Sequence, residues 1–178
     1  MAVHNASTMV DAPFHQVYTL FTHFNDFPKF TSHVKEVTYY DDNRSHWVAD
    51  VLGHHEWDAV NEDWIENRQI GWRSTGGLEN AGRVTFQDLG GDRTRVAVRI
   101  EYKPPAGIAG DVAEAAGAGS RFEKALQEDL DNFAKMVREA PPGALDPESS
   151  HYLFHGESAA AKGETTEEQD RSMNRRAA

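Results

Sequence analysis

A long amphipathic segment over residues 105–137 constrains the fold more than any other stretch of this sequence. Its apolar side chains recur at the spacing of an α-helix, and most of its charged side chains fall on the opposite side. The apolar positions are Ile108, Val112, Ala115, Phe122, Leu126, Leu130, Phe133, Met136 and Val137. A helix of this length cannot bury its apolar face alone, so a broad concave partner has to receive it.

The segments before this helix alternate apolar and polar residues with a period of two. Such alternation is typical of an antiparallel sheet with one buried and one wet face. The clearest case is 94–102, where Val96, Val98 and Ile100 fall on the face expected to point inward. Strands are predicted over residues 2–10, 33–40, 44–52, 55–66, 68–75, 81–89 and 94–102.

Two short helices are predicted after the first strand. Residues 13–23 place apolar side chains at helical spacing behind Asp11, a favourable N-cap, and a second short helix or turn is expected over 26–31. The order of elements predicts an α+β fold, in which a curved antiparallel sheet of about seven strands wraps around the long C-terminal helix. The domain is expected to cover residues 1–140, followed by a flexible acidic tail over 141–178. Residues 156–178 contain almost no large apolar residue and are too poor in them to form a core. The alternative for Tyr152, Leu153 and Phe154, an apolar island in this tail, is docking on the domain.

Composition excludes several classes of protein. Lys and Arg total 18 against 29 Asp and Glu, and the basic residues do not gather into the patch that binding to phosphates requires. The absence of cysteine excludes disulfides and thiolate metal sites. No stretch is long and apolar enough to cross a membrane, and the first residues lack the regions of a signal peptide. We expect a cytoplasmic protein with no nucleic-acid partner and no integral membrane segment, and the oligomeric state is left open.

Histidines and glycines give two further expectations. His54 and His55 are neighbours on a predicted strand, so their rings face opposite sides, and His15 and His23 are expected on helix surfaces; we predict no metal site and no cofactor. The other feature is the pair of glycines at 117 and 119.

Gly117 and Gly119 lie in the leanest part of the long helix, between Ile108 and Ser120. Each glycine costs a helix interior about 1 kcal/mol relative to alanine. One interpretation is a thin or bent segment at the mouth of a pocket, where a lid opens. The other is close packing of the helix on the sheet, or a plain break between a loop and a shorter helix.

Several short strings resemble the START-like (SRPBCC) superfamily, which has the helix-grip fold of Bet v 1 and includes polyketide cyclase/dehydrases and coenzyme Q-binding START proteins. The matching strings are Val10-Asp11-Ala12-Pro13, Phe24-Asn25-Asp26-Phe27-Pro28-Lys29-Phe30, His46-Trp47, Glu56-Trp57-Asp58-Ala59, Ile70-Gly71-Trp72-Arg73-Ser74, Gly82-Arg83-Val84-Thr85-Phe86 and Gly91-Asp92-Arg93-Thr94-Arg95-Val96. The resemblance covers residues 2–139 and implies a cavity between the sheet and the long helix.

The resemblance also implies that a hydrophobic ligand binds in this cavity against the inward-facing side chains. Walls of mixed aromatic and aliphatic residues with a few polar groups suit such a ligand. The candidate ligand-binding residues are Trp47, Trp57, Ile70, Trp72, Phe86, Val98, Ile100, Tyr102, Phe122 and Leu126. The alternative is that the same side chains fill the interior as an ordinary core, because alternation alone does not distinguish a hollow interior from a packed one.

Three functions stay open at this point. The first is binding or carriage of a hydrophobic small molecule such as a lipid, a quinone or a polyketide. The second is an aromatase/cyclase-type enzyme, for which Ser74, Tyr102 and Tyr39 are the candidate catalytic residues because their hydroxyl groups can orient and polarise a carbonyl. The third is a protein-interaction module with a filled interior and an exposed apolar patch.

Overall fold

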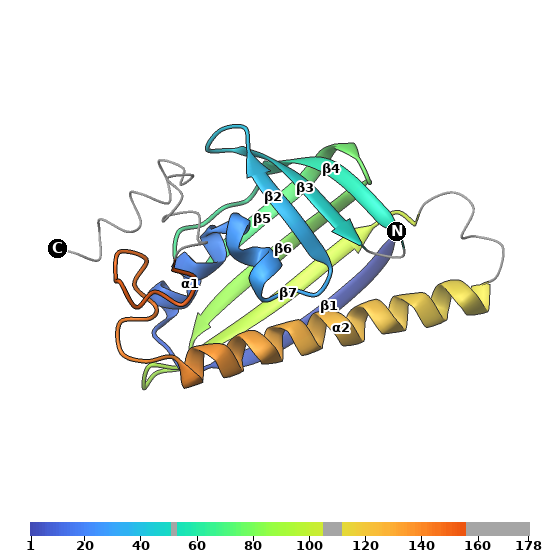
Figure 1. Cartoon of the computed structure of the whole chain (residues 1–178). Helices are drawn as coiled ribbons and strands as arrows, with labels where there is room; N and C mark the ends of the chain where they lie inside the picture. Colours follow the sequence, from blue (N-terminus) through green and yellow to red (C-terminus); the bar gives the residue numbers. More distant parts are fainter. Residues whose placement is uncertain (51–52, 105–111, 156–178) are drawn as a thin grey trace.

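The structure, a computed structural model, describes residues 1–50, 53–104 and 112–155 (Figure 1). Its elements in chain order are β1 (Ala2–Val10), α1 (Phe14–Thr22), the 3₁₀-helix η1 (Phe24–Lys29), β2 (Val34–Tyr39), β3 (Arg44–Asp50), β4 (His54–Asn61), β5 (Gln69–Gly77), β6 (Asn80–Asp88), β7 (Thr94–Tyr102) and α2 (Val112–Glu139). The predicted α+β helix-grip fold is confirmed.

All seven strands form one antiparallel sheet in the order β1-β7-β6-β5-β4-β3-β2. The strands from β2 to β7 are neighbours in both sequence and space, as short connections favour. The first strand, β1, is an edge strand of the sheet. It pairs along its whole length with the last strand, β7, from Ala2 opposite Tyr102 to Val10 opposite Thr94. Figure 1 shows the curved sheet above α2, which runs alongside β1, with α1 at one end.

Two predicted boundaries need comment. The strand expected over 55–66 ends at Asn61, because the chain turns away in a connection where Asp63 and Asn67 adopt left-handed backbone angles, with φ of 52° and 59°. The long helix is continuous over Val112–Glu139, and the start predicted for it, at residues 105–111, lies outside the described residues.

A cluster of aromatic rings fills the interior where α1, η1 and α2 meet. Phe133 of α2 is fully buried, and its ring meets Phe21 of α1 edge-on, with 4.8 Å between the ring centres. Phe30, which follows η1, lies 5.0 Å from Phe133 on another side. Such offset and edge-on contacts are the favourable arrangements for aromatic rings. This end of the interior is therefore a packed core.

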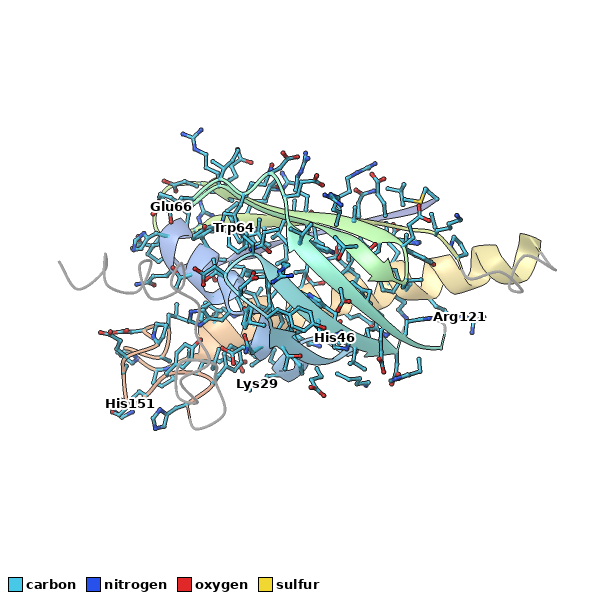
Figure 2. All side chains as sticks on the ribbon, turned by 90° about the horizontal axis from the view of Figure 1, so that it is seen from above. Lys29, His46, Trp64, Glu66, Arg121 and His151 are labelled. Atoms are coloured by element: carbon cyan, nitrogen blue, oxygen red, sulfur yellow. The ribbon has the colours of Figure 1, made fainter. Side chains whose placement is uncertain are left out.

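The C-terminal segment over 141–155 packs on the domain, in agreement with the docking considered for Tyr152, Leu153 and Phe154. Tyr152 and Phe154 are only 3% and 5% exposed. The ring of Phe154 stacks on Phe30, and the ammonium group of Lys29 lies 5.5 Å from its centre. In Figure 2, Lys29 and His151 lie on the same side of the molecule. The predicted boundary at residue 140 therefore cuts through packed chain, whereas 156–178 lie outside the described residues.

A buried polar cluster ties this segment to η1. The carboxylate of Asp26, which is fully buried, accepts a hydrogen bond from Lys29 Nζ over 2.8 Å and another from the Tyr152 hydroxyl over 3.2 Å. His23 Nδ1 lies 3.8 Å from the same carboxylate. His23 is fully buried, so its predicted place on a helix surface is wrong; the C-terminal segment covers it.

Close packing of α2 on the sheet accounts for one of the two helical glycines. A Cβ on Gly119 would lie 3.2 Å from Cε1 of His4, so β1 approaches the helix more closely than most side chains allow. A Cβ on Gly117 would have Arg121 Nη2 as a neighbour at 3.8 Å, an ordinary contact. Of the two interpretations, Gly119 fits close helix-on-sheet packing, and the helix has no break here.

Candidate ligand-binding cavity

A cavity of about 120 Å³ lies between the concave face of the sheet and α2. Side chains alternate between the two faces along each strand, so every second residue points into the cavity. Trp47, Trp57 and Trp72 lie on the same face of three neighbouring strands and form part of its wall. The helical period adds Phe122 and Leu126 from α2. Pockets for drug-sized ligands usually measure about 300–1,000 Å³, whereas an engineered cavity of about 150 Å³ takes up benzene. This cavity therefore has room for one ring or a comparably short chain.

The structure brings most of the predicted lining residues together. Those that line the cavity are Trp47, Trp57, Trp72, Val98, Ile100, Tyr102, Phe122 and Leu126. Ile70 and Phe86 do not line it. Ile70 is fully buried, and Phe86 packs edge-on against Tyr18 of α1, so both belong to the packed core.

Sequence reasoning missed part of the wall, which comes from α1, η1, α2, the strands β2, β3 and β6, and the loops. These residues are Phe21, Phe27, Phe30, Thr31, His33, Val34, Ala49, Leu78, Asn80, Val84, Asp129 and Leu130. Helical spacing from Phe122 and Leu126 would have found Asp129 and Leu130. The loop residues show no sequence periodicity, because the direction of their side chains depends on the segments that pack around them.

Only one of the three candidate catalytic residues lines the cavity. Tyr102 is 5% exposed, and no described residue is a hydrogen-bond partner of its hydroxyl. Burial raises the pKa of Tyr102, which keeps this hydroxyl protonated and able to donate. The Tyr102 ring stacks on His4, with 5.5 Å between the centres, and meets Phe122 edge-on.

The other two candidates use their hydroxyl groups for the fold. Tyr39 accepts a hydrogen bond from the backbone N–H of Phe24 over 2.8 Å and donates to the carbonyl of Thr22, which fixes the junction between α1 and η1. Ser74 accepts from the backbone N–H of Asn80 over 2.9 Å, where β5 turns into β6. The structure therefore does not bring Ser74, Tyr39 and Tyr102 together around one point.

The three indole N–H groups in the wall differ in their partners. Trp47 donates to the hydroxyl of Ser45 over 2.8 Å, and Trp72 donates to Oδ1 of Asn80 over 3.1 Å. Trp57 Nε1 is buried and has no hydrogen-bond partner among the described residues. The Trp47 and Trp57 rings stack with 5.8 Å between their centres, so a paired and an unpaired indole lie side by side in the wall.

Two further polar groups lie in the wall near the start of β2. Asp129 of α2 accepts hydrogen bonds from both the backbone N–H and the hydroxyl of Ser32. Burial raises the pKa of Asp129, although the Ser32 hydrogen bonds act in the opposite direction. His33 Nδ1 lies 3.0 Å from the carbonyl oxygen of Asp50, and His33 Nε2 is buried without a partner among the described residues.

A separate group of ionisable side chains lies on the outer face of the sheet, away from the cavity. His46, labelled in Figure 2, is 2.9 Å from Asp58, and His54 contacts Asp50 and Glu56. Hydrogen bonds to those two carboxylates raise the pKa of His54. In the described ranges, no three His, Asp or Glu residues are placed to hold a metal ion. No described helix combines the length and the hydropathy needed to cross a bilayer.

A curved seven-stranded sheet around a long C-terminal helix, with a cavity between them, defines a protein of the START-like class. The chain belongs to the family described as polyketide cyclase/dehydrase and lipid transport, whose pattern matches residues 10–130. That match covers most of the sheet and α2 up to Leu130, which includes nearly all of the cavity wall.

Individual proteins are also similar to this chain. A protein of Streptomyces lincolnensis, described as an uncharacterized 17.2 kDa protein in the melC2-rnhH intergenic region, is 34% identical over 135 residues, which cover 75% of this chain and 87% of the relative. Two solved structures share the fold. The START superfamily protein of Mycobacterium smegmatis superposes with a TM-score of 0.55 at 18% identity, covering 75% of this chain and 99% of the other. The ZhuI aromatase/cyclase of Streptomyces sp. R1128 superposes with a TM-score of 0.59 at 16% sequence identity. The superposition covers 76% of this chain and 93% of the other.

Proposed function

We propose that this protein binds or carries a hydrophobic small molecule in the cavity between the sheet and α2. The supporting observation is a space of about 120 Å³ walled mostly by aromatic and aliphatic side chains inside an otherwise close-packed domain. Side chains around an unfilled space lose dispersion contacts, and an apolar molecule of matching shape restores them. The ligand is a lipid, a quinone, a polyketide or a molecule of similar character.

The size of the cavity limits how such a ligand fits. A long acyl chain or a fused-ring polyketide is larger than about 120 Å³, so only one end of it fits between the walls as they stand. The third function considered, a protein-interaction module, requires a filled interior, and the cavity argues against it.

Catalysis of the aromatase/cyclase type is the second candidate. One observation favours it: the Tyr102 hydroxyl faces no protein partner among the described residues, in a cavity whose ligand can carry a carbonyl. Ser74 and Tyr39 take no part, because their hydroxyl groups are held by the backbone elsewhere. Turnover of a polyketide substrate that survives Tyr102→Phe would end this candidacy.

Toluene is a suitable probe for the first candidate because it is one ring in size and has no polar group. The wild-type protein is expected to bind toluene in an NMR titration that follows the methyl groups of Val98 and Ile100. The variant Ile100→Trp fills the cavity from β7 and is expected to weaken binding at least about tenfold. Ile65→Trp is the matched control, since Ile65 is 52% exposed and does not line the cavity. Absence of toluene binding, or equal binding by both variants, would contradict the proposal.

A further inference from the structure

We propose that the C-terminal segment over 141–155 is a strap that closes one side of the cavity, and that its release lets the ligand enter and leave. This inference rests on the proposed function, because it concerns the exchange of the same ligand. Two side-chain contacts carry it, one with η1 and one with Phe30 directly after η1. Figure 1 shows the segment, in orange to red, at the C-terminal end of α2.

The first contact holds η1 against the strap. The hydroxyl of Tyr152 donates a hydrogen bond over 3.2 Å to the carboxylate of Asp26, whose side chain is fully buried. Asp26 precedes Phe27, another residue of η1, which lines the cavity. A hydrogen bond to a carboxylate is about twice as strong as one between neutral groups, so its loss should weaken docking of the strap.

The second contact involves Phe30, which belongs both to the cavity wall and to the surface on which the strap docks. Phe30 lines the cavity, and its ring stacks on Phe154 of the strap with 6.0 Å between the ring centres. Phe154 is buried and does not line the cavity itself. The strap therefore supports this part of the wall from outside, and its departure removes one of the ring contacts that hold Phe30 in place.

The connection to α2 and the internal hydrogen bonds of the strap favour its movement as a unit. Pro141 follows shortly after α2 and cannot continue the helix, and Gly143 has a left-handed φ of 83°. Turns then fold the strap on itself, as in the hydrogen bond of 2.8 Å from Leu153 N–H to the carbonyl of Ala144. The two contacts described above, by contrast, are made by side chains. Breaking them leaves the backbone hydrogen bonds of the sheet and of α2 in place.

Docking of the strap is a balance of opposing terms. Burial of the rings of Tyr152 and Phe154 favours the docked state. Burial of the Asp26 carboxylate opposes it, because a charge that leaves water loses hydration, and release of the strap lets water return. The free energy of docking is therefore smaller than that of the whole fold, so the strap can open while the sheet stays folded.

The strap lies outside the part of the chain that matches the family. The family pattern covers residues 10–130, whereas the strap begins at 141. The cavity and its closure are therefore specified by different parts of the sequence. Substitutions in the strap can then change ligand exchange while they leave the cavity wall intact.

Release of the strap can be measured by native-state proteolysis with chymotrypsin, which cleaves after aromatic residues. Tyr152 is buried, so cleavage after position 152 requires release and reports the released population when opening is fast. Tyr152→Phe and Phe154→Ala both keep an aromatic residue at position 152, and each is expected to accelerate this cleavage about tenfold. Glu148→Ala is the matched control, because Glu148 is an exposed residue of the strap, and it should leave the rate unchanged.

Ligand exchange is measured on the same proteins with toluene, from NMR line shapes of the Val98 and Ile100 methyl groups. A gate changes the rates of entry and exit by the same factor, since it acts on the path and not on the bound state. Tyr152→Phe and Phe154→Ala should therefore raise both rate constants about tenfold and leave Kd unchanged. Damage to the wall itself would instead change Kd, as expected for Ile100→Trp.

Failure of the inference and failure of the proposed function give different results. If cleavage accelerates in the two variants and the toluene rates do not, the ligand passes elsewhere and the inference is overturned. Cleavage that stays slow in both variants would show that these contacts do not hold the strap, which overturns it as well. In either case toluene still binds and the proposed function stands. A wild-type protein that binds no toluene contradicts the proposed function itself.

Discussion

The hydroxyl of Tyr152 donates a hydrogen bond of 3.2 Å to Oδ2 of Asp26 and so joins two residues that are 126 positions apart in the sequence. Both residues are buried, and the ring of Phe154 stacks nearby on Phe30. The C-terminal segment over 141–155 thereby becomes part of the domain.

Removing this hydroxyl should destabilise the protein. In Tyr152→Phe the buried carboxylate of Asp26 keeps Lys29 but loses one donor, and we expect the free energy of unfolding to fall by about 1–3 kcal/mol in urea denaturation. Tyr40→Phe is the matched control, because Tyr40 donates to Asp58 on the exposed face of the sheet, and it should leave the stability nearly unchanged. Equal losses in the two variants would contradict a specific role for the buried hydrogen bond.

Tyr39 should prove structural. Its hydroxyl accepts from Phe24 N–H and donates to the carbonyl of Thr22, so Tyr39→Phe removes both of these hydrogen bonds. We expect a loss of about 1–2 kcal/mol in the free energy of unfolding. Binding of toluene at a temperature where the variant is folded should match the wild type. A selective loss of ligand binding with unchanged stability would contradict a purely structural role and support Tyr39 as a residue of the ligand-binding site.

Two glycines are expected to respond to alanine in opposite directions. A Cβ on Gly82 of β6 would overlap the Trp72 indole, which forms part of the cavity wall. Gly82→Ala therefore displaces that ring and should cost about 1–3 kcal/mol. Among the described residues, a Cβ at position 117 meets Arg121 at 3.8 Å, an ordinary contact, so Gly117→Ala should gain about 0.5–1 kcal/mol because alanine favours the helix. Thermal or urea unfolding of both variants checks the two signs, and a stable Gly82→Ala protein would contradict this placement of Trp72.

Ionisation of Asp129 should lower the stability of the protein as pH rises. Its pKa is raised above the ordinary value of 3.8, so between these two values the folded state binds more protons than the unfolded state, and the free energy of unfolding decreases as pH rises through this window. Asp129→Asn removes the titration while its amide oxygen can still accept from Ser32. Measured in urea, the stability of the variant relative to the wild type should therefore be higher at pH 7 than at pH 3.5. A relative stability that is constant or falls with pH would contradict the raised pKa.

Much of the fold could be predicted because strand and helix periods are local. Alternation along 94–102 puts Val98 and Ile100 on the inner face, and the structure has both in the cavity wall. Boundaries were less predictable: nothing in the composition of 55–66 shows that the strand ends at Asn61, because that end depends on left-handed angles at Asp63 in the connection.

The same local reasoning reached its limit at the candidate site. Alternation allowed Ser74 and Tyr39 to point toward a ligand, but both hydroxyl groups are used by the backbone of other segments. It also placed Ile70 and Phe86 in the cavity wall, whereas packing against α1 and the other strands buries them in the core.

By itself, the sequence determined which side of each element is apolar, because that follows from periods of two and 3.6 residues along a few neighbouring positions. Only the tertiary structure decided where the apolar sides fail to fill space, and which buried polar atoms find a hydrogen-bond partner. Trp57 lacks a hydrogen-bond partner among the described residues although Trp47 and Trp72 have one, and His33 takes its tautomer from Asp50. These properties depend on side chains that only folding brings together.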